Sequence, residues 1–188
     1  MDQPKKTVYV NYCDSINEAK VKAIMGVLSE VINRERPDVI YFLISSSGGL
    51  VEAGITLHNF LRALPVEIIM HNSGGIDSIA NVIFLAADKR LASVHSSFLF
   101  HGLTWNFEAK TSLTKNQLTE IMSNIEISES KISGIMTERT KLTDEDVKSL
   151  FHQGASKDAS FALSKGVIGE IKNPEIPKGV NILSFNLP

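Results

Sequence analysis

The feature that most constrains the fold is a nearly continuous apolar run over residues 38–45, DVIYFLIS, with turn-forming residues at both ends. A run of this kind is typical of a central strand in a parallel sheet that is covered on both faces. Parallel neighbours need crossover connections, which are usually helices. The run therefore predicts an α/β fold with helices above and below the sheet.

Neighbouring segments supply the alternation that such a fold requires. Residues 7–13 (TVYVNYC) are rich in β-branched and aromatic side chains, and residues 66–70 (VEIIM) form another short apolar run. Between these strand candidates, residues 17–33 and 50–64 carry apolar side chains near the 3.6-residue period of a helix. The order strand, helix, strand, helix, strand predicts consecutive β-α-β units and a mostly parallel sheet.

The remaining chain continues in the same way and contains no repeat or interdomain linker. The sequence predicts one domain over residues 1–188, with its core at 7–171 and a C-terminal tail at 172–188 that lies on the body or on a neighbour. The further elements expected, in chain order, are a polar turn over 71–75, a buried helix over 76–87, strands over 91–94 and 97–101, a long helix over about 113–139, a helix beginning at Thr143 with a capping box, a helix over 158–165 and a strand over 167–171.

Charge and composition exclude several classes of function. Nineteen Lys and Arg against 21 Asp and Glu give a formal charge of −2, and no basic cluster exceeds the pair Lys5 and Lys6, so we expect no nucleic-acid partner. No apolar stretch approaches the roughly 20 residues of a membrane span, and the start lacks a secretory signal, which predicts a cytoplasmic protein. The single cysteine, Cys13, and the absence of paired-histidine spacing favour neither a disulfide nor a metal site.

Two glycine-containing turns, at 47–49 and 73–78, each follow a strand candidate and open a helix. Ligands of α/β sheets lie at the carboxyl ends of the strands, where helix N-termini present free N–H groups. Neither turn has the spacing of a nucleotide-binding loop. From the residues alone, Ser78 or Asp77 is more simply a helix cap, and His101, at the end of the run FLFH, is more simply a structural residue.

Taken together, four segments resemble the ClpP family, the proteolytic subunit of the ATP-dependent Clp protease, within the ClpP/crotonase superfamily. They are residues 44–54 (ISSSGGLVEAG), 74–80 (GGIDSIA), 97–101 (SFLFH) and 162–171 (ALSKGVIGEI), and their order and spacing match that family over about residues 7–171. The resemblance implies a single-domain ClpP/crotonase-like fold whose long helix is the family's handle.

The resemblance also implies a serine-type endopeptidase and assigns roles within it. Ser78 corresponds to the nucleophile and His101 to the general base. The backbone N–H groups of Gly48 and Ile79 correspond to the oxyanion hole. A peptide or unfolded-protein substrate would lie extended near residues 99–101, and no cofactor or metal is implied.

The third member of the triad is not at its expected place. Ungapped counting puts the family's aspartate at Gly154, which has no side chain. Asp77, Asp158 and His152 are the remaining candidates, although Asp77 is more simply a residue that points away and Asp158 a helix N-cap. The sequence departs from the family again at Asp77, where a small residue is usual.

Two alternatives to a peptidase follow. The missing aspartate favours a catalytically impaired ClpP-like assembly or scaffold subunit, and the shared two-turn architecture allows a crotonase-like acyl-CoA enzyme, which would leave Ser78 and His101 without a role. As partners, the resemblance implies a homo-oligomer and a Clp-type ATPase. Only six residues precede Thr7, where the family carries a longer docking segment, which argues against the ATPase.

Overall fold

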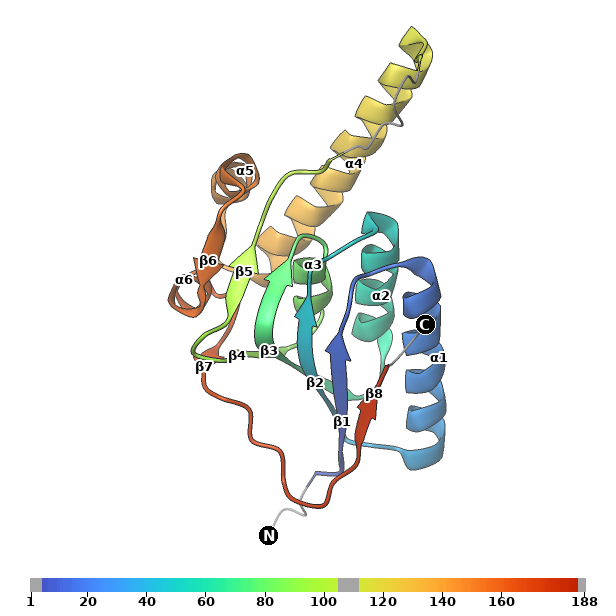
Figure 1. Cartoon of the computed structure of the whole chain (residues 1–188), viewed down its shortest axis with the longest axis vertical. Helices are drawn as coiled ribbons and strands as arrows, with labels where there is room; N and C mark the ends of the chain where they lie inside the picture. The colour runs from blue at the N-terminus through green and yellow to red at the C-terminus, as the bar shows by residue number, and fades with distance from the viewer. Residues whose placement is uncertain (1–4, 105–111, 186–188) are drawn as a thin grey trace.

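A computed structural model describes residues 5–104 and 112–185 and shows eight strands in one sheet (Figure 1). The spatial order is β6-β5-β3-β2-β1-β8, with β4 pairing to both β3 and β7. The strands are β1 (Thr7–Cys13), β2 (Val39–Ser46), β3 (Glu67–Asp77), β4 (Lys89–Ala92), β5 (Ser97–Leu99), β6 (Ser156–Asp158), β7 (Glu170–Ile171) and β8 (Ile182–Ser184). The helices are α1 (Glu18–Glu35), α2 (Val51–Ala63), α3 (Ala80–Phe84), α4 (Lys115–Arg139), α5 (Asp144–Gln153) and α6 (Ala159–Ser164).

The sheet is mostly parallel, which confirms the predicted α/β class. Strands β1, β2 and β3 pair in parallel, with a register shift between β2 and β3 after Ile44, and β4, β5, β7 and β8 join them in parallel as well. Strand β6 alone is antiparallel, to β5. The carboxyl ends of β1, β2 and β3 therefore lie at one edge of the sheet, beyond which α4 projects (Figure 1).

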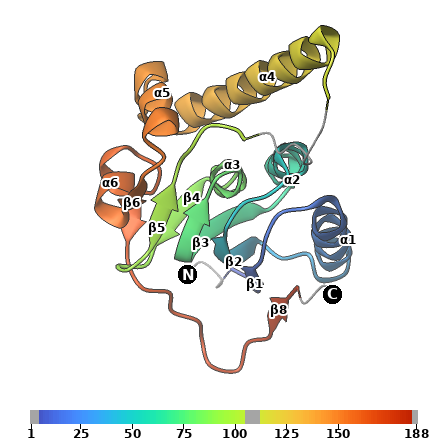
Figure 2. The same cartoon turned by 45° about the horizontal axis from the view of Figure 1, so that its top comes forward.

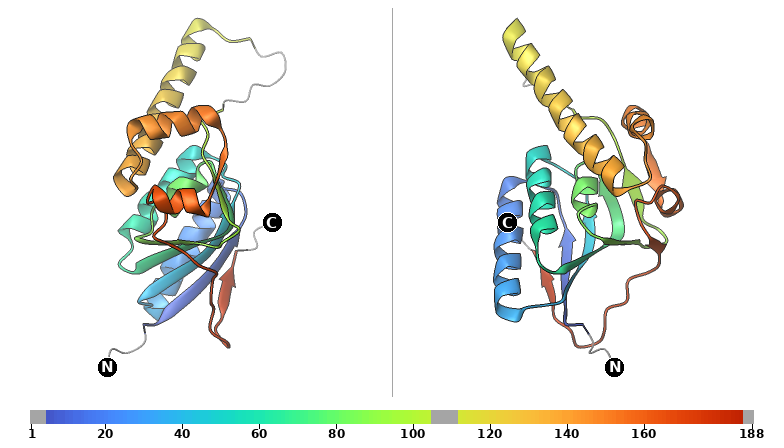
Figure 3. Two further views of the ribbon diagram at one scale, coloured as in Figure 1. Left: turned by 90° about the vertical axis from the view of Figure 1, so that its left-hand side faces the viewer. Right: turned by 180° about the vertical axis from the view of Figure 1, so that it is seen from behind.

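The expectation of helices on both faces of the sheet is wrong. Helices α1, α2 and α3 lie side by side on one face (Figure 3, right). Along β2, the side chains that face these helices are buried, Ile40, Phe42 and Ile44 among them, whereas Tyr41 and Leu43 on the opposite face are only half-buried. The apolar run looked continuous because its half-buried face also carries large side chains, and one-sided burial needs no second helical layer.

The prediction for residues 71–87 is also wrong in its boundaries. Strand β3 does not end at residue 70 but continues to Asp77, and the helix after it, α3, has only five residues, all buried as an interior helix should be. The extension is made by tertiary pairing, since Ser46 of β2 and residues 97–99 of β5 pair with the last part of β3. The sharp turn consequently falls at Ser78 and not at the two glycines before it.

Local capping accounts for the helices in the second half. Thr114 and Gln117 form a capping box at the start of α4, and the predicted box of Thr143 and Asp146 opens α5. Asp158 caps α6 as predicted. The strand expected over 167–171 is reduced to β7, whereas the tail contributes β8, which pairs with β1 at the sheet edge (Figure 2). Across residues 5–104 and 112–185, no helix combines the length and the apolar character that a bilayer crossing requires.

Candidate active site

Ser78 occupies the sharp turn between β3 and α3 in a strained backbone conformation. Its φ is 55°, and in the described part of the chain only Arg36 shares a positive φ among non-glycine residues. A positive φ is unfavourable for a residue with a Cβ and persists where the surrounding structure imposes it. A serine on such a strand-to-helix turn presents its hydroxyl outward, as nucleophile turns do in other α/β enzymes.

Gly48 packs directly against this turn. Its φ is 84°, and a Cβ at this position would lie 2.7 Å from both Asp77 O and Ser78 Cβ, and 3.3 Å from Ile79 N. Both of the predicted oxyanion-hole residues, Gly48 and Ile79, are therefore adjacent to Ser78. The Gly48 N–H donates to Ser46 Oγ at 3.2 Å, whereas within residues 5–104 and 112–185 no acceptor is recorded for the Ile79 N–H.

Main-chain and side-chain hydrogen bonds connect the end of β5 to the Ser78 turn. The Ser78 N–H donates to Leu99 O at 2.9 Å, next to the paired residues Asp77 and Leu99. Asn81 strengthens this link, because its Nδ2 donates to Ser78 O at 3.0 Å and to Leu99 O at 2.9 Å. His101 follows Leu99 by two residues, so it lies beyond the carboxyl end of β5, at the same end of the sheet as Ser78.

The His101 ring is held by the carbonyl group of the next residue. Its Nδ1 lies 2.7 Å from Gly102 O. A carbonyl oxygen only accepts hydrogen bonds, so Nδ1 carries the proton in this arrangement. The neutral ring then has its lone pair on Nε2, which is the protonation state that a general base of a serine hydrolase requires.

Of the three candidates for the third triad member, Asp77 lies at the end of β3 and pairs with Leu99, two residues before His101. Burial raises the pKa of the Asp77 carboxyl above its usual value, while the Leu99 N–H and the His101 ring act in the opposite direction. Asp158 instead faces Ser97 across the β5–β6 pair and accepts from the Phe161 N–H at 2.8 Å as the cap of α6.

His152 lies exposed in the last turn of α5. Gly154 caps that helix. The antiparallel register of β5 and β6 pairs Leu99 with Ser156. Extrapolated by two residues beyond the strands, that register would set Gly154 opposite His101. Gly154 has a φ of 56°, and no heavy atom lies within 4 Å of the place where its Cβ would be.

For a chain that hydrolyses peptides with Ser78 and His101, as the resemblance implies, the substitution Gly154→Asp should raise kcat about tenfold. Asp and Asn tolerate a left-handed backbone better than other residues with a side chain, and the space beside residue 154 is open. A carboxylate there would offer His101 Nδ1 a charge-assisted hydrogen bond, which is worth about 1 to 1.5 kcal/mol more than a neutral one. That difference corresponds to about a factor of ten in rate.

Gly154→Asn is the matched control, because it has the same shape and backbone tolerance without the charge. Initial rates on a fluorogenic peptide amide would be compared for the three proteins at equal concentration. Equal rates for the Asp and Asn variants would contradict the assignment of residue 154 to the carboxylate position.

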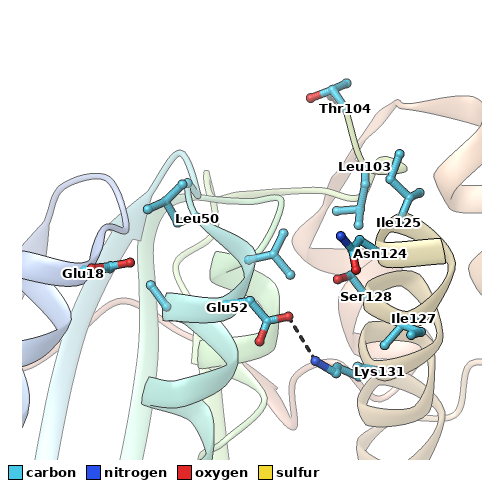
Figure 4. A pocket seen from close by; sticks show the side chains of 13 residues that line it. Glu18, Leu50, Glu52, Leu103, Thr104, Asn124, Ile125, Ile127, Ser128 and Lys131 are labelled. Carbon is cyan, nitrogen blue, oxygen red and sulfur yellow. Dashed lines mark hydrogen bonds and ion pairs between the residues drawn. The ribbon is translucent and has the colours of Figure 1, made fainter. Parts of the chain in front are cut away.

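A cavity of about 620 Å³ lies between the start of α2 and the middle of α4 (Figure 4). Gly49 and Leu50 line it from the glycine turn, and Leu103 and Thr104 line it from the segment that follows His101. Glu52 and Lys131 form an ion pair across it at 3.0 Å. A chain segment bound in this cavity would therefore contact the loops that carry Gly48 and His101.

Sequence reasoning missed residues that support the site rather than form it. Asn81 falls within a segment that was predicted as a helix from its apolar neighbours. Its side chain links the Ser78 turn to β5 by a hydrogen bond to Leu99 O, a partner that is distant in the sequence. Gly54 allows α2 to approach Ile79, since a Cβ there would collide with the Ile79 side chain. A glycine in a helix interior was a usable signal for close packing. Nothing in the sequence pointed to Asn81.

The described residues contain no group of three or more His, Cys, Asp or Glu side chains placed to hold a metal ion. The candidate site combines one hydroxyl, that of Ser78, with one imidazole, that of His101, and with the main-chain amides of Gly48 and Ile79. This set of groups is suited to acyl transfer through a tetrahedral intermediate, in which the amides stabilise the oxyanion.

Comparisons with known proteins identify the family of the chain. The family model described as Clp protease matches residues 3–175. The ATP-dependent Clp protease proteolytic subunit 2 of Pseudomonas aeruginosa is 27% identical over 173 residues, which cover 91% of this chain and 84% of the relative. The ATP-dependent Clp protease proteolytic subunit of Pleurastrum terricola is 27% identical over 112 residues, covering 58% of this chain and 57% of that protein.

Among solved structures, a ClpP1 mutant from Listeria monocytogenes superposes with a TM-score of 0.77 at 20% identity, covering 90% of this chain and 92% of that one. This likeness shows the fold, including the mostly parallel sheet and the long helix. The match of the family model over nearly the whole chain goes further. By that match, the chain belongs to the Clp protease family.

Proposed function

We propose that this chain is a serine peptidase that hydrolyses peptide bonds with Ser78 as nucleophile and His101 as general base. The N–H groups of Gly48 and Ile79 form the oxyanion hole. The proposal depends above all on one observation. The strained turn at Ser78 contacts Gly48 on one side and is hydrogen-bonded on the other side to Leu99, two residues before His101.

The first half of the reaction forms an acyl-enzyme. Ser78 Oγ attacks the carbonyl carbon of the scissile bond and passes its proton to His101 Nε2. The oxyanion accepts hydrogen bonds from the Ile79 N–H and from the Gly48 N–H, which exchanges Ser46 Oγ for this stronger, charged acceptor. The C–N bond then breaks as His101 returns the proton to the departing amine.

The second half repeats these steps with water. His101 takes a proton from the water, whose oxygen attacks the ester carbon of Ser78. The tetrahedral intermediate again places its oxyanion between the two main-chain amides. Collapse of that intermediate returns the proton to Ser78 Oγ and releases the carboxylic acid product. Throughout, Gly102 O holds His101 Nδ1, so the ring keeps its orientation.

A peptide substrate lies extended across the cavity between α2 and α4. The segment at Leu103 and Thr104 and the turn at Gly49 and Leu50 are on opposite sides of that cavity (Figure 4). Gly49, Leu50 and Thr104 are exposed, and Leu103 is half-buried. The Leu50 and Leu103 N–H groups already donate to Ile16 O and Glu129 Oε1, so pairing with an extended peptide uses the other main-chain groups of these segments.

A fluorophosphonate probe tests the proposal directly, because it reacts with a serine hydroxyl that an adjacent base activates. We expect the intact protein to be labelled once, and peptide mass spectrometry to locate the label at Ser78. Heat-denatured protein is the control for non-specific reaction. Absence of a label on the folded protein would contradict a serine peptidase and favour the non-catalytic assembly subunit, for which the side-chain-free position at Gly154 is the supporting observation.

The family match does not favour the acyl-CoA alternative.

We also propose that the chain assembles into a homo-oligomer through α4. Two large apolar side chains one turn apart on this helix, Leu118 and Met122, are strongly exposed on one face. Exposed apolar side chains that adjoin one another are typical of contact surfaces. A Clp-type ATPase is the partner that family membership suggests.

A further inference from the structure

The peptide group between Gly102 and Leu103 has hydrogen bonds at both of its ends. Its carbonyl oxygen, Gly102 O, accepts from His101 Nδ1 at 2.7 Å. Its N–H, on Leu103, donates to Glu129 Oε1 at 3.2 Å. A carboxylate on α4 is thereby connected to the imidazole of His101 through a single planar group.

We propose that Glu129 is a positioning residue for His101, acting through the Gly102–Leu103 peptide group. The proposal rests on the function proposed above, in which His101 is the general base. It assigns to a carboxylate on α4 and a main-chain carbonyl the orienting role that a triad aspartate fills in a single step.

The geometry of a peptide group explains how this works. In a trans peptide, the N–H and the C=O point in opposite directions from one rigid plane. Fixing the N–H on Glu129 therefore fixes the direction of Gly102 O, and with it the ring of His101. A negative charge at the N–H end also polarises the group, which makes its carbonyl oxygen a stronger acceptor.

The surroundings of Gly102 fit this role. A Cβ at this position would lie 3.3 Å from Glu129 Oε1, a tight contact that glycine avoids. The Gly102 N–H donates to Phe151 O of α5 at 3.2 Å, so the residue is held from a second helix as well. The glycine after the histidine is thus restrained by hydrogen bonds on both sides.

Glu129 differs from the other acidic residues considered for the third position. Asp77 interacts with His101 by charge from β3, and Asp158 is engaged as a helix cap. Glu129 is half-buried on α4, and it is joined to the histidine by an unbroken series of hydrogen bonds. Because a peptide group stands between them, no proton passes from His101 to Glu129.

The first test separates kcat from KM. Glu129→Ala removes the acceptor of the Leu103 N–H, and we expect kcat on a fluorogenic peptide amide to fall about tenfold, the size of one lost charged hydrogen bond, with KM within twofold of wild type. Glu129→Gln keeps an acceptor oxygen without the charge and should restore kcat to within about threefold of wild type. Glu126→Ala, at an exposed position one turn earlier on α4, is the control.

The second test does not require turnover. In protein labelled with ¹⁵N-histidine, two-bond correlation spectra distinguish the Nδ1–H from the Nε2–H tautomer of a neutral ring. The His101 signal, assigned by its loss in a His101→Gln variant, should show the Nδ1–H form in wild type and in Glu126→Ala. In Glu129→Ala it should shift towards the Nε2–H form while the melting temperature stays within about 2 °C of wild type.

Together with fluorophosphonate labelling of Ser78, the two tests distinguish failure of this proposal from failure of the peptidase assignment. An unlabelled Ser78 together with a His101 tautomer that responds to Glu129→Ala would overturn the peptidase and support the connection between Glu129 and His101. A labelled Ser78 with kcat and tautomer in Glu129→Ala equal to those in Glu126→Ala would overturn the positioning role. An Nε2–H form of His101 in the wild-type protein would overturn it as well.

Discussion

Ser78→Ala is expected to lower kcat for peptide hydrolysis by about 10²- to 10⁴-fold. In serine proteases, removing the complete triad lowers kcat by about 2 × 10⁶-fold, and removing the aspartate alone lowers it by about 3 × 10⁴-fold. The serine and histidine that remain without the aspartate therefore still raise kcat by roughly 10²-fold. His101 retains the useful tautomer through Gly102 O. The loss on removing Ser78 should therefore exceed that lower limit.

The fold should survive this substitution, because the structure records only main-chain hydrogen bonds at Ser78 within the described residues. Its N–H donates to Leu99 O, and its carbonyl oxygen accepts from both nitrogen groups of Asn81. Alanine keeps all three bonds and the same Cβ. The measurement is initial rate on a fluorogenic peptide amide together with the melting temperature. Ser160→Ala, on the exposed surface of α6, is the matched control, and wild-type turnover by Ser78→Ala would refute the nucleophile assignment.

The second large effect is expected at Gly48, where alanine should lower kcat by about 10²- to 10³-fold, the range found when one oxyanion donor is lost. The new Cβ would stand 2.7 Å from both Asp77 O and Ser78 Cβ. These atoms belong to the backbone and to the base of a side chain, so they cannot rotate away. The turn at Gly48 must therefore move from Ser78 and withdraw its N–H from the oxyanion position.

Gly179→Ala is the control that separates the effect of this collision on kcat from the effect of backbone strain. Gly179 has a φ of 81°, close to the 84° of Gly48, but nothing lies within 4 Å of its Cβ position. Both variants pay the left-handed penalty of roughly 1 to 2 kcal/mol for a residue with a Cβ, whereas only Gly48→Ala disturbs the site. Comparable kcat values for the two variants would contradict a role for Gly48 in catalysis. Circular dichroism spectra would verify that both proteins are folded.

The elements with strong local signals were predicted well from the sequence. The helical period over residues 17–33 became α1, and the pair Thr143 and Asp146 opened α5 as a capping box. Such signals depend on neighbours three or four residues away, so they are present in the sequence itself. The α/β class followed from the same kind of information.

Elements that depend on distant partners were predicted less well. Strand β3 contains Ser73, Gly74 and Gly75, which locally favour a turn, yet the strand continues through them to Asp77, and from Gly75 onward it pairs with β5. The one-sided burial of β2 had a related cause, because an apolar run does not reveal how many layers cover it. In both cases the tertiary environment overrode local preference.

For the candidate site, the sequence determined which chemical groups are available: a serine after a glycine-containing strand, a histidine at the end of a short apolar strand, and paired glycines at another strand end. Only the tertiary structure decided how these groups combine, through the left-handed turn at Ser78 and the fit of Gly48 against it. The same holds for the hydrogen bonds that connect His101 through Gly102 and Leu103 to Glu129 on α4, 26 residues after Leu103. Residue types and local periods are properties of the chain itself, whereas contacts between remote segments exist only after the sheet has formed.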